Sequence, residues 1–186
     1  MARIPLISSK DELAEADQTI YAETLKMPGV TQQITGPQRL VLRNVKLNHG
    51  FQALVSALRT ETSVSYRDQE LAILATVREK RSAYPWGAHV TRGREAGVSE
   101  SAIDVIRSGA SPEGLPPADG AIITYARQLA RDGQAEQAAF DRLLSSHDER
   151  WLMELTLLIS WYCGVATFAN AFEIEPGEGA DPLPVT

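Results

Sequence analysis

The segment between residues 65 and 97 constrains the fold more than any other part of this 186-residue chain. It holds two consecutive helix patterns, expected over Tyr66–Arg81 and Ala83–Ala96, with almost no loop between them. Ser65 precedes the first pattern as an N-cap, and Gly97 follows the second in the C′ position that ends a helix. Two helices joined so closely pack in opposite directions, so we predict an antiparallel helical hairpin.

Each helix of this hairpin carries one ionisable residue within its apolar face. Glu70 shares its face with Tyr66, Ile73, Leu74 and Val77, and His89 shares its face with Pro85, Trp86, Gly93 and Ala96. Burial of an unpaired charge is costly, so we predict that Glu70 and His89 meet across the hairpin and share a proton. Taken singly, Glu70 could instead extend to solvent or act as a cap, and His89 could be a hydrogen-bonded core residue.

Helical periodicity covers most of the remaining chain, and no segment shows the pattern of a strand. The other expected helices are Lys10–Lys26, Pro37–Thr60, a short helix from Ser99 to Ser108, Ala118–Arg131, Glu136–Ser145 and Arg150–Phe172. The pair His49-Gly50 is the expected place for a bend in the second of them. Residues 174–186 are rich in Gly and Pro and are expected to be extended or disordered. The sequence therefore predicts one all-α domain over residues 1–186.

Composition argues against several kinds of partner and compartment. The net charge is −6 and Lys and Arg are not clustered, so the chain lacks the basic surface that binds nucleic acid. The single cysteine, Cys163, cannot form an internal disulfide, and the charged N-terminal residues do not resemble a signal peptide. We therefore expect a cytoplasmic protein.

The apolar stretch Leu155–Phe172 raises the question of a membrane helix. It is 18 residues long, near the lower limit for crossing a bilayer, but it contains several polar residues and is flanked by acids. A helix that is apolar on all sides also suits a protein core or an oligomer interface. We expect a buried helix and no membrane span. Its apolar surface exceeds what one small domain hides, so we also predict a homo-oligomer.

The hairpin also resembles a known family signature. Glu70, Ser82, Pro85 and His89 follow the spacing of the carboxymuconolactone decarboxylase and AhpD-like superfamily, whose redox-active members carry a glutamate, a Cys-x-x-Cys pair and a histidine. The resemblance extends over RDQELAILATVREKRSAYPWGAHVTRGREAGVSESAIDVIRSG and ELTLLISWYCGVATFANAFEIEP. It implies an AhpD-like helical bundle that assembles as a trimer or hexamer. Because Ser82 and Pro85 replace both cysteines, it favours the decarboxylase branch.

This resemblance implies a decarboxylase without cofactor or metal that acts on a small-molecule substrate, a carboxylated lactone or related acid. Glu70 and His89 would be catalytic, as a relay that delivers a proton to carbon. The candidate substrate-binding residues are Ser82, Tyr84, Trp86 and Arg92, and the candidate arginines for the substrate carboxylates are Arg43, Arg81 and Arg92. Ser82 could instead be a plain helix cap. Two other functions stay open: an oligomeric binding protein that has lost the reaction, and an AhpD-like antioxidant protein.

Overall fold

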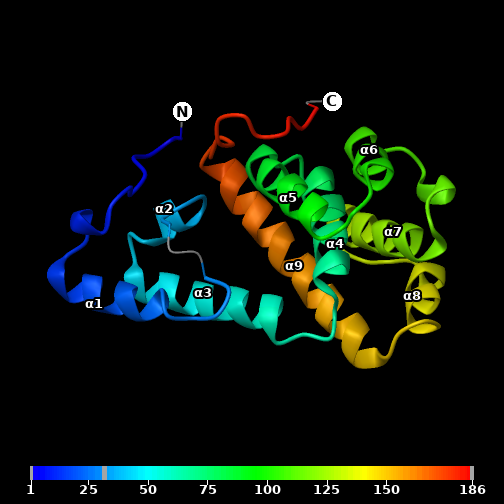
Figure 1. Ribbon diagram of the computed structural model, residues 1–186, viewed down its shortest axis with the longest axis horizontal. Helices are drawn as coiled ribbons and strands as arrows, with labels where there is room; N and C mark the ends of the chain where they lie inside the picture. Colours follow the sequence, from blue (N-terminus) through cyan, green and yellow to red (C-terminus); the bar gives the residue numbers. More distant parts are fainter. Residues whose placement is uncertain (1, 31–32, 185–186) are drawn as a thin grey trace.

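The computed structural model describes residues 2–30 and 33–184, and over these residues the protein is all-α, as predicted. The helices are α1 (Glu15–Thr24), α2 (Gln38–Val41), α3 (Val45–Thr60), α4 (Tyr66–Glu79), α5 (Ala83–Glu95), α6 (Glu100–Ser108), α7 (Pro117–Asp132), α8 (Gln137–Leu144) and α9 (Glu149–Ala171). Short 3-10 turns occur at Lys10–Glu12 and Pro112–Gly114. Helices α4 to α9 form a bundle, and α1 to α3 lie beside it (Figure 1).

Helix α4 is the centre of the bundle and packs against α5, α7 and α9 (Figure 1). Ser65 caps its first turn by accepting a hydrogen bond from the backbone N–H of Asp68, as predicted. Every residue from Gln69 to Val77 is buried. A polar side chain in this stretch must therefore find its partner within the protein.

The predicted hairpin is present as α4 and α5, and its turn is fastened to α9. Arg81 in this turn has a left-handed backbone, with φ 51°. Ser82 occupies the N-cap position of α5, but its hydroxyl does not cap the helix and donates instead to the Ala166 carbonyl, 3.3 Å away. The Asn170 side chain donates to the Lys80 carbonyl at 2.9 Å. Ser82 thus occupies the predicted cap position, but the prediction that its hydroxyl caps the helix is wrong.

Helix α9 is the long apolar helix, and it packs along α4 and α7. Its length and composition would suffice to cross a membrane, but Leu155, Leu158 and Ile159 are among the side chains that it buries in the bundle. This packing accounts for its apolar character. Only 39% of the most apolar 18-residue stretch of this helix is buried. An exposed strip that includes Met153 and Leu157 therefore remains on its outer side.

The N-terminal helices differ most from the predicted ones. The helix expected over Lys10–Lys26 begins later, as α1, after the first 3-10 turn. The helix expected over Pro37–Thr60 is divided into α2 and α3, and the chain runs through His49-Gly50 without a break. The division lies at residues 42–44: α2 ends at Val41, and Asn44 has an extended backbone and a side chain that accepts from the Leu47 N–H to cap α3.

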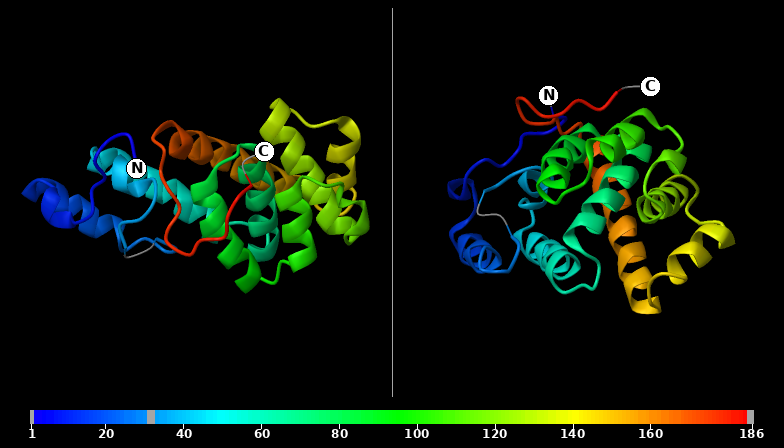
Figure 2. Two further views of the ribbon diagram at one scale, coloured as in Figure 1. Left: turned by 90° about the horizontal axis from the view of Figure 1, so that it is seen from above. Right: turned by 45° about the vertical axis from the view of Figure 1, so that its right-hand side comes forward.

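Helices α1 and α3 pack together as an arm at one end of the molecule (Figures 1 and 2). The arm has a small hydrophobic core of its own, whose buried members are Ile7, Leu13, Tyr21, Leu42 and Val45. The main core is built from α4 to α9 and is separate from it. A third cluster, formed by Leu40, Ala169 and Ile174, joins α2 to the end of α9.

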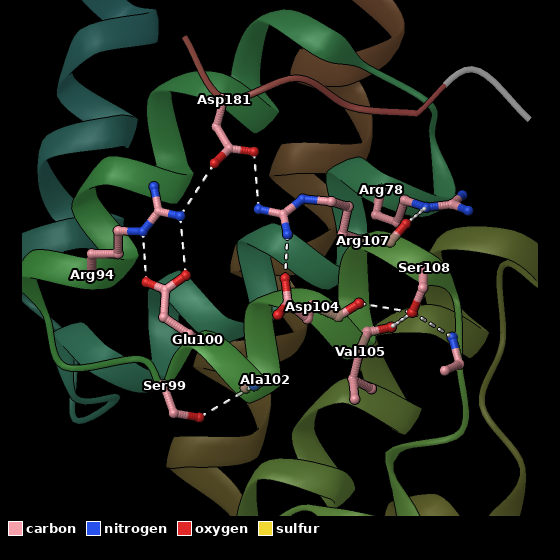
Figure 3. Close-up of polar contacts among 11 residues, drawn as sticks. Arg78, Arg94, Ser99, Glu100, Ala102, Asp104, Val105, Arg107, Ser108 and Asp181 are labelled. Carbon is pink, nitrogen blue, oxygen red and sulfur yellow. Dashed lines mark hydrogen bonds and ion pairs between the residues drawn. The ribbon is translucent and has the colours of Figure 1, made fainter.

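The residues after α9 form an extended tail that is anchored on the bundle. Asp181 accepts hydrogen bonds from Arg94 of α5 at 3.2 Å and from Arg107 of α6 at 3.0 Å (Figure 3). The tail also passes so close to α5 that a Cβ on Gly87 would lie 2.8 Å from the side chain of Ala180. The extended conformation agrees with the prediction, whereas these anchors were not evident from the composition of the tail.

Candidate functional site

Glu70 of α4 and His89 of α5 meet inside the bundle. The carboxylate oxygen Oε2 of Glu70 lies 2.6 Å from Nδ1 of His89. The Glu70 side chain is fully buried and that of His89 is 5% exposed. This contact confirms the prediction that the two residues meet across the hairpin in a buried setting.

A third residue, Arg59 in the last turn of α3, completes the polar cluster. Its guanidinium donates to the other carboxylate oxygen of Glu70, Oε1, and lies over the Tyr66 ring, 4.9 Å from its centroid. Arg59 was not predicted from the sequence, because an arginine in the last turn of a helix is ordinarily explained by the helix dipole. It belongs to a different helix from Glu70, so helical periodicity gives no signal for the pair.

These three side chains determine one another's protonation. Burial raises the pKa of Glu70, but His89 and Arg59 outweigh this effect, and the pKa falls below its usual value. Burial lowers the pKa of His89, and the opposing effect of Glu70 does not restore it. Near neutral pH, Glu70 is therefore an anion and His89 a neutral imidazole. We assign the ring hydrogen to Nδ1, which donates to Glu70, so Nε2 is left as an acceptor.

His89 lines a cavity of about 140 Å³ between α3, α5, α9 and the residues around the start of α2. The wall is largely aromatic, with Phe51, Tyr84, Trp161 and Tyr162. The rings of Phe51 and Trp161 lie 4.7 Å apart, and the Tyr162 ring meets His89 edge-on at 5.0 Å. A small, mostly apolar cavity with a few polar groups is the usual form of a site for a small molecule.

Of the four candidate substrate-binding residues, Tyr84 and Arg92 line this cavity, and Ser82 and Trp86 do not. Pro85, Ala88, His89 and Arg92 line it at the spacing of one helix face. Trp86 follows Pro85 and so points roughly 100° away around the helix. There it is fully buried, with the Arg107 guanidinium 5.7 Å from its ring.

The other candidates from the sequence lie elsewhere. Arg43 donates to the Pro5 carbonyl, and Arg81 is exposed in the hairpin turn. His49 pairs with the Thr24 hydroxyl at 3.0 Å. No group of three or more His, Cys, Asp and Glu side chains in the described ranges could hold a metal ion.

Comparison with known proteins agrees with the hairpin signature. Residues 46–128, which run from α3 into α7, match the profile of the Carboxymuconolactone decarboxylase family. This segment contains Arg59, Glu70 and His89. The match supports the resemblance over this segment, which is a little less than half of the chain. No match was found among curated proteins.

The exchange Glu70→Gln tests whether the cluster is a buried charge pair. It keeps the side-chain size but leaves the Arg59 guanidinium, 12% exposed, without its carboxylate. Loss of one partner of a buried pair costs about 3–5 kcal/mol of unfolding free energy, and we expect a loss of this order in urea denaturation. The exposed Glu178 in the tail provides the control, Glu178→Gln, which should change little. Equal unfolding free energies of Glu70→Gln and Glu178→Gln would refute the buried ion pair between Arg59 and Glu70.

The titration of His89 provides a second test. Its pKa should lie below the ordinary value of 6.5, as read from the imidazole signals in NMR spectra. Because Glu70 raises this pKa and Arg92 lowers it, Glu70→Gln should shift it further down and Arg92→Met should shift it up.

The same shift predicts how stability depends on pH. The unfolded chain binds this proton more readily than the folded protein. The unfolding free energy should therefore fall as the pH drops below about 6.5, the ordinary pKa, and His89→Asn should weaken this dependence. A titration of His89 at or above the ordinary pKa would contradict the assignment of a neutral imidazole.

Proposed function

We propose that the protein is a cofactor-free carboxy-lyase of the carboxymuconolactone decarboxylase type, acting on a small carboxylated lactone or a related acid. The observation that carries this proposal is the buried series Arg59–Glu70–His89, which ends at the wall of a small, aromatic-lined cavity. The family match supports the same type of chemistry. We further propose that the protein works in the cytoplasm.

The reaction requires one proton to be delivered to carbon. The bond between carbon and the carboxylate breaks, CO₂ leaves, and the electron pair moves into a conjugated carbonyl of the substrate. Because Nδ1 of His89 is committed to Glu70, Nε2 is the ring nitrogen that can carry the proton. An anionic substrate favours the imidazolium form, so His89 takes up a proton on binding and then passes it to the substrate carbon.

Each of the other two residues has a supporting part in this transfer. Glu70 fixes the orientation of the imidazole through Nδ1 and stabilises its cationic form. Arg59 helps to keep Glu70 ionised, since it lowers the pKa of that carboxyl. Burial raises the pKa of Tyr162 to about 12, so the phenol beside His89 keeps its proton and does not compete as a base.

The alternative of a thiol-based antioxidant has less support from the site. Residues 82 and 85 are Ser and Pro, neither of which forms a thiolate. Cys163 lies in α9, and burial raises the pKa of its thiol, whereas reactive cysteines have a lowered pKa. Both observations favour proton chemistry at His89 over redox chemistry.

The exchange His89→Asn tests the catalytic role. Loss of a general acid–base group lowers turnover about 10²–10⁴-fold, and we expect this loss in CO₂ release from carboxylated butenolides. His49→Asn is the matched control, because His49 lies in the arm and does not line the cavity. Cys163→Ser should also keep full activity. Turnover that survives His89→Asn would exclude the proposed relay.

The surface of α9 supports a proposal about assembly. Its exposed strip continues into a groove of about 620 Å³ formed with α7 and α8. Phe140, Leu144, Met153 and Leu157 in this groove are between 37% and 55% exposed. We propose that a second copy of the chain covers them in a homo-oligomer, a trimer or hexamer as the family resemblance implies.

The exchange Leu157→Lys should break this assembly, because it places a charge in the centre of the apolar strip. Light scattering at micromolar concentration should show an oligomer for the unmodified protein and a smaller species for the variant. Leu47→Lys provides the control, since Leu47 is 62% exposed on α3 and lies outside the groove. A monomeric unmodified protein would refute the proposal, and dissociation by Leu47→Lys alone would move the interface to the arm.

A further inference from the structure

The cavity beside His89 is lined by a buried amide that has no partner. Gln38, the first residue of α2, is 3% exposed, and both its Nε2 and its Oε1 lack a hydrogen bond within the described part of the chain. Buried amides are nearly always paired, since loss of hydration without a replacement is unfavourable. An unpaired amide at the wall of a cavity can be satisfied by the molecule that the cavity binds.

The backbone before Gln38 fixes the position of this amide. Gly36 has a φ of +53°, and a Cβ at this residue would lie 2.3 Å from the Tyr84 hydroxyl. Thr35, the residue before this glycine, lines the cavity together with Tyr84. The segment is thus pressed against α5 by a contact that only glycine permits, which holds Gln38 at the cavity wall.

The cavity also carries a single full positive charge. Among the described residues that line it, Arg92 is the one Lys or Arg side chain, and neither Asp nor Glu is present. No carboxylate of the described chain pairs with Arg92, whereas Arg59 nearby is committed to Glu70. One carboxylate on a ligand would therefore be matched by Arg92. Arg92 is exposed to solvent, and a second carboxylate placed in the interior of the cavity would have no cation beside it.

The size of the cavity restricts the ligand further. A dry cavity of about 150 Å³ in another protein accommodates benzene. The 140 Å³ beside His89 therefore suits a compound with one ring and small substituents. The aromatic side chains of Phe51 and Trp161 offer ring surfaces for a planar, unsaturated ligand.

We propose that the substrate is a single-ring unsaturated lactone or ketone with one carboxylate, which Arg92 binds while the Gln38 amide N–H donates to the ring carbonyl. This inference rests on the proposed lyase function. The C–COO⁻ bond breaks, CO₂ leaves, and the electron pair moves through the double bond to the carbonyl oxygen. His89 then protonates the ring carbon. Negative charge develops at the atom that Gln38 contacts, so this hydrogen bond strengthens during the reaction.

Binding can be measured apart from catalysis with a saturated probe. Such a probe, γ-carboxy-γ-butyrolactone, has the ring, the carbonyl and one carboxylate but lacks the conjugated double bond. Calorimetry should show that it binds about tenfold more tightly than its methyl ester, and about tenfold more tightly than the analogue with an added carboxymethyl group. Arg92→Met should remove the advantage over the ester.

Variants of Gln38 test the amide itself. Gln38→Met keeps the approximate size, so it should weaken binding of the probe about tenfold and raise the urea midpoint of the unliganded protein, since an unpaired amide is removed. Gln38→Glu, a second variant, should abolish binding by repulsion. The control is Gln18→Met, because Gln18 is a partly buried glutamine of α1 that donates to the Leu13 carbonyl and does not line the cavity. Its affinity for the probe should be unchanged.

Three results would overturn the inference. The first is that the unmodified protein binds the probe and its carboxymethyl analogue with equal affinity. The second is that Gln38→Met binds the probe as tightly as the unmodified protein does, and the third is that none of the probes binds. A urea midpoint that falls in Gln38→Met would also contradict it, because the amide would then have a partner in the protein. The proposed lyase function is tested by a separate measurement. If γ-carboxybutenolide releases no CO₂ although the predicted binding pattern holds, the proposed reaction is wrong and the ligand class stands.

Discussion

The carboxylate of Glu70 is a full charge placed at the centre of a hydrophobic helix bundle, and the site depends on how that charge is compensated. Helix α4 gives it no access to water, so both oxygens need partners from other helices. Arg59 comes from α3 and His89 from α5, and the carboxylate therefore links three helices. A buried ion pair often adds little net stability compared with apolar side chains of the same volume. What it contributes here is a fixed orientation of His89 and a fixed tautomer.

The sequence was sufficient to predict the bundle and the centre of the site. Caps at Ser65 and Ser99 and regular apolar faces placed the helices from α4 to α9 close to their observed bounds. The Glu70–His89 contact was predictable because both residues belong to one hairpin with a short turn, which limits how their faces can meet. Local patterns are reliable where the elements that they describe are also neighbours in space.

The rest of the site depends on contacts between segments that are distant in the sequence. Arg59 reaches it from α3 and Gln38 from α2, and no periodicity links either residue to α5. Trp86 was placed at the site because it lies one turn from His89, yet its ring is on the side of α5 that faces Arg107. Ser82 has the sequence context of a cap, but its hydroxyl bonds to α9. Such choices follow from tertiary packing, which helix propensity does not encode.

The separate cores of the arm and the bundle have a consequence for how a ligand enters. The cavity lies on the seam between them, with Phe51 on one side and Trp161 on the other. The hairpin turn is tied to α9, so the bundle side of the seam is rigid. The arm is also fixed to the bundle, because Arg59 of α3 pairs with the buried Glu70 and Leu58 of α3 packs against the main core. A movement of the arm that widened the cavity would therefore disturb the Arg59–Glu70 pair, so the entry of a ligand and the charge state of the relay are coupled.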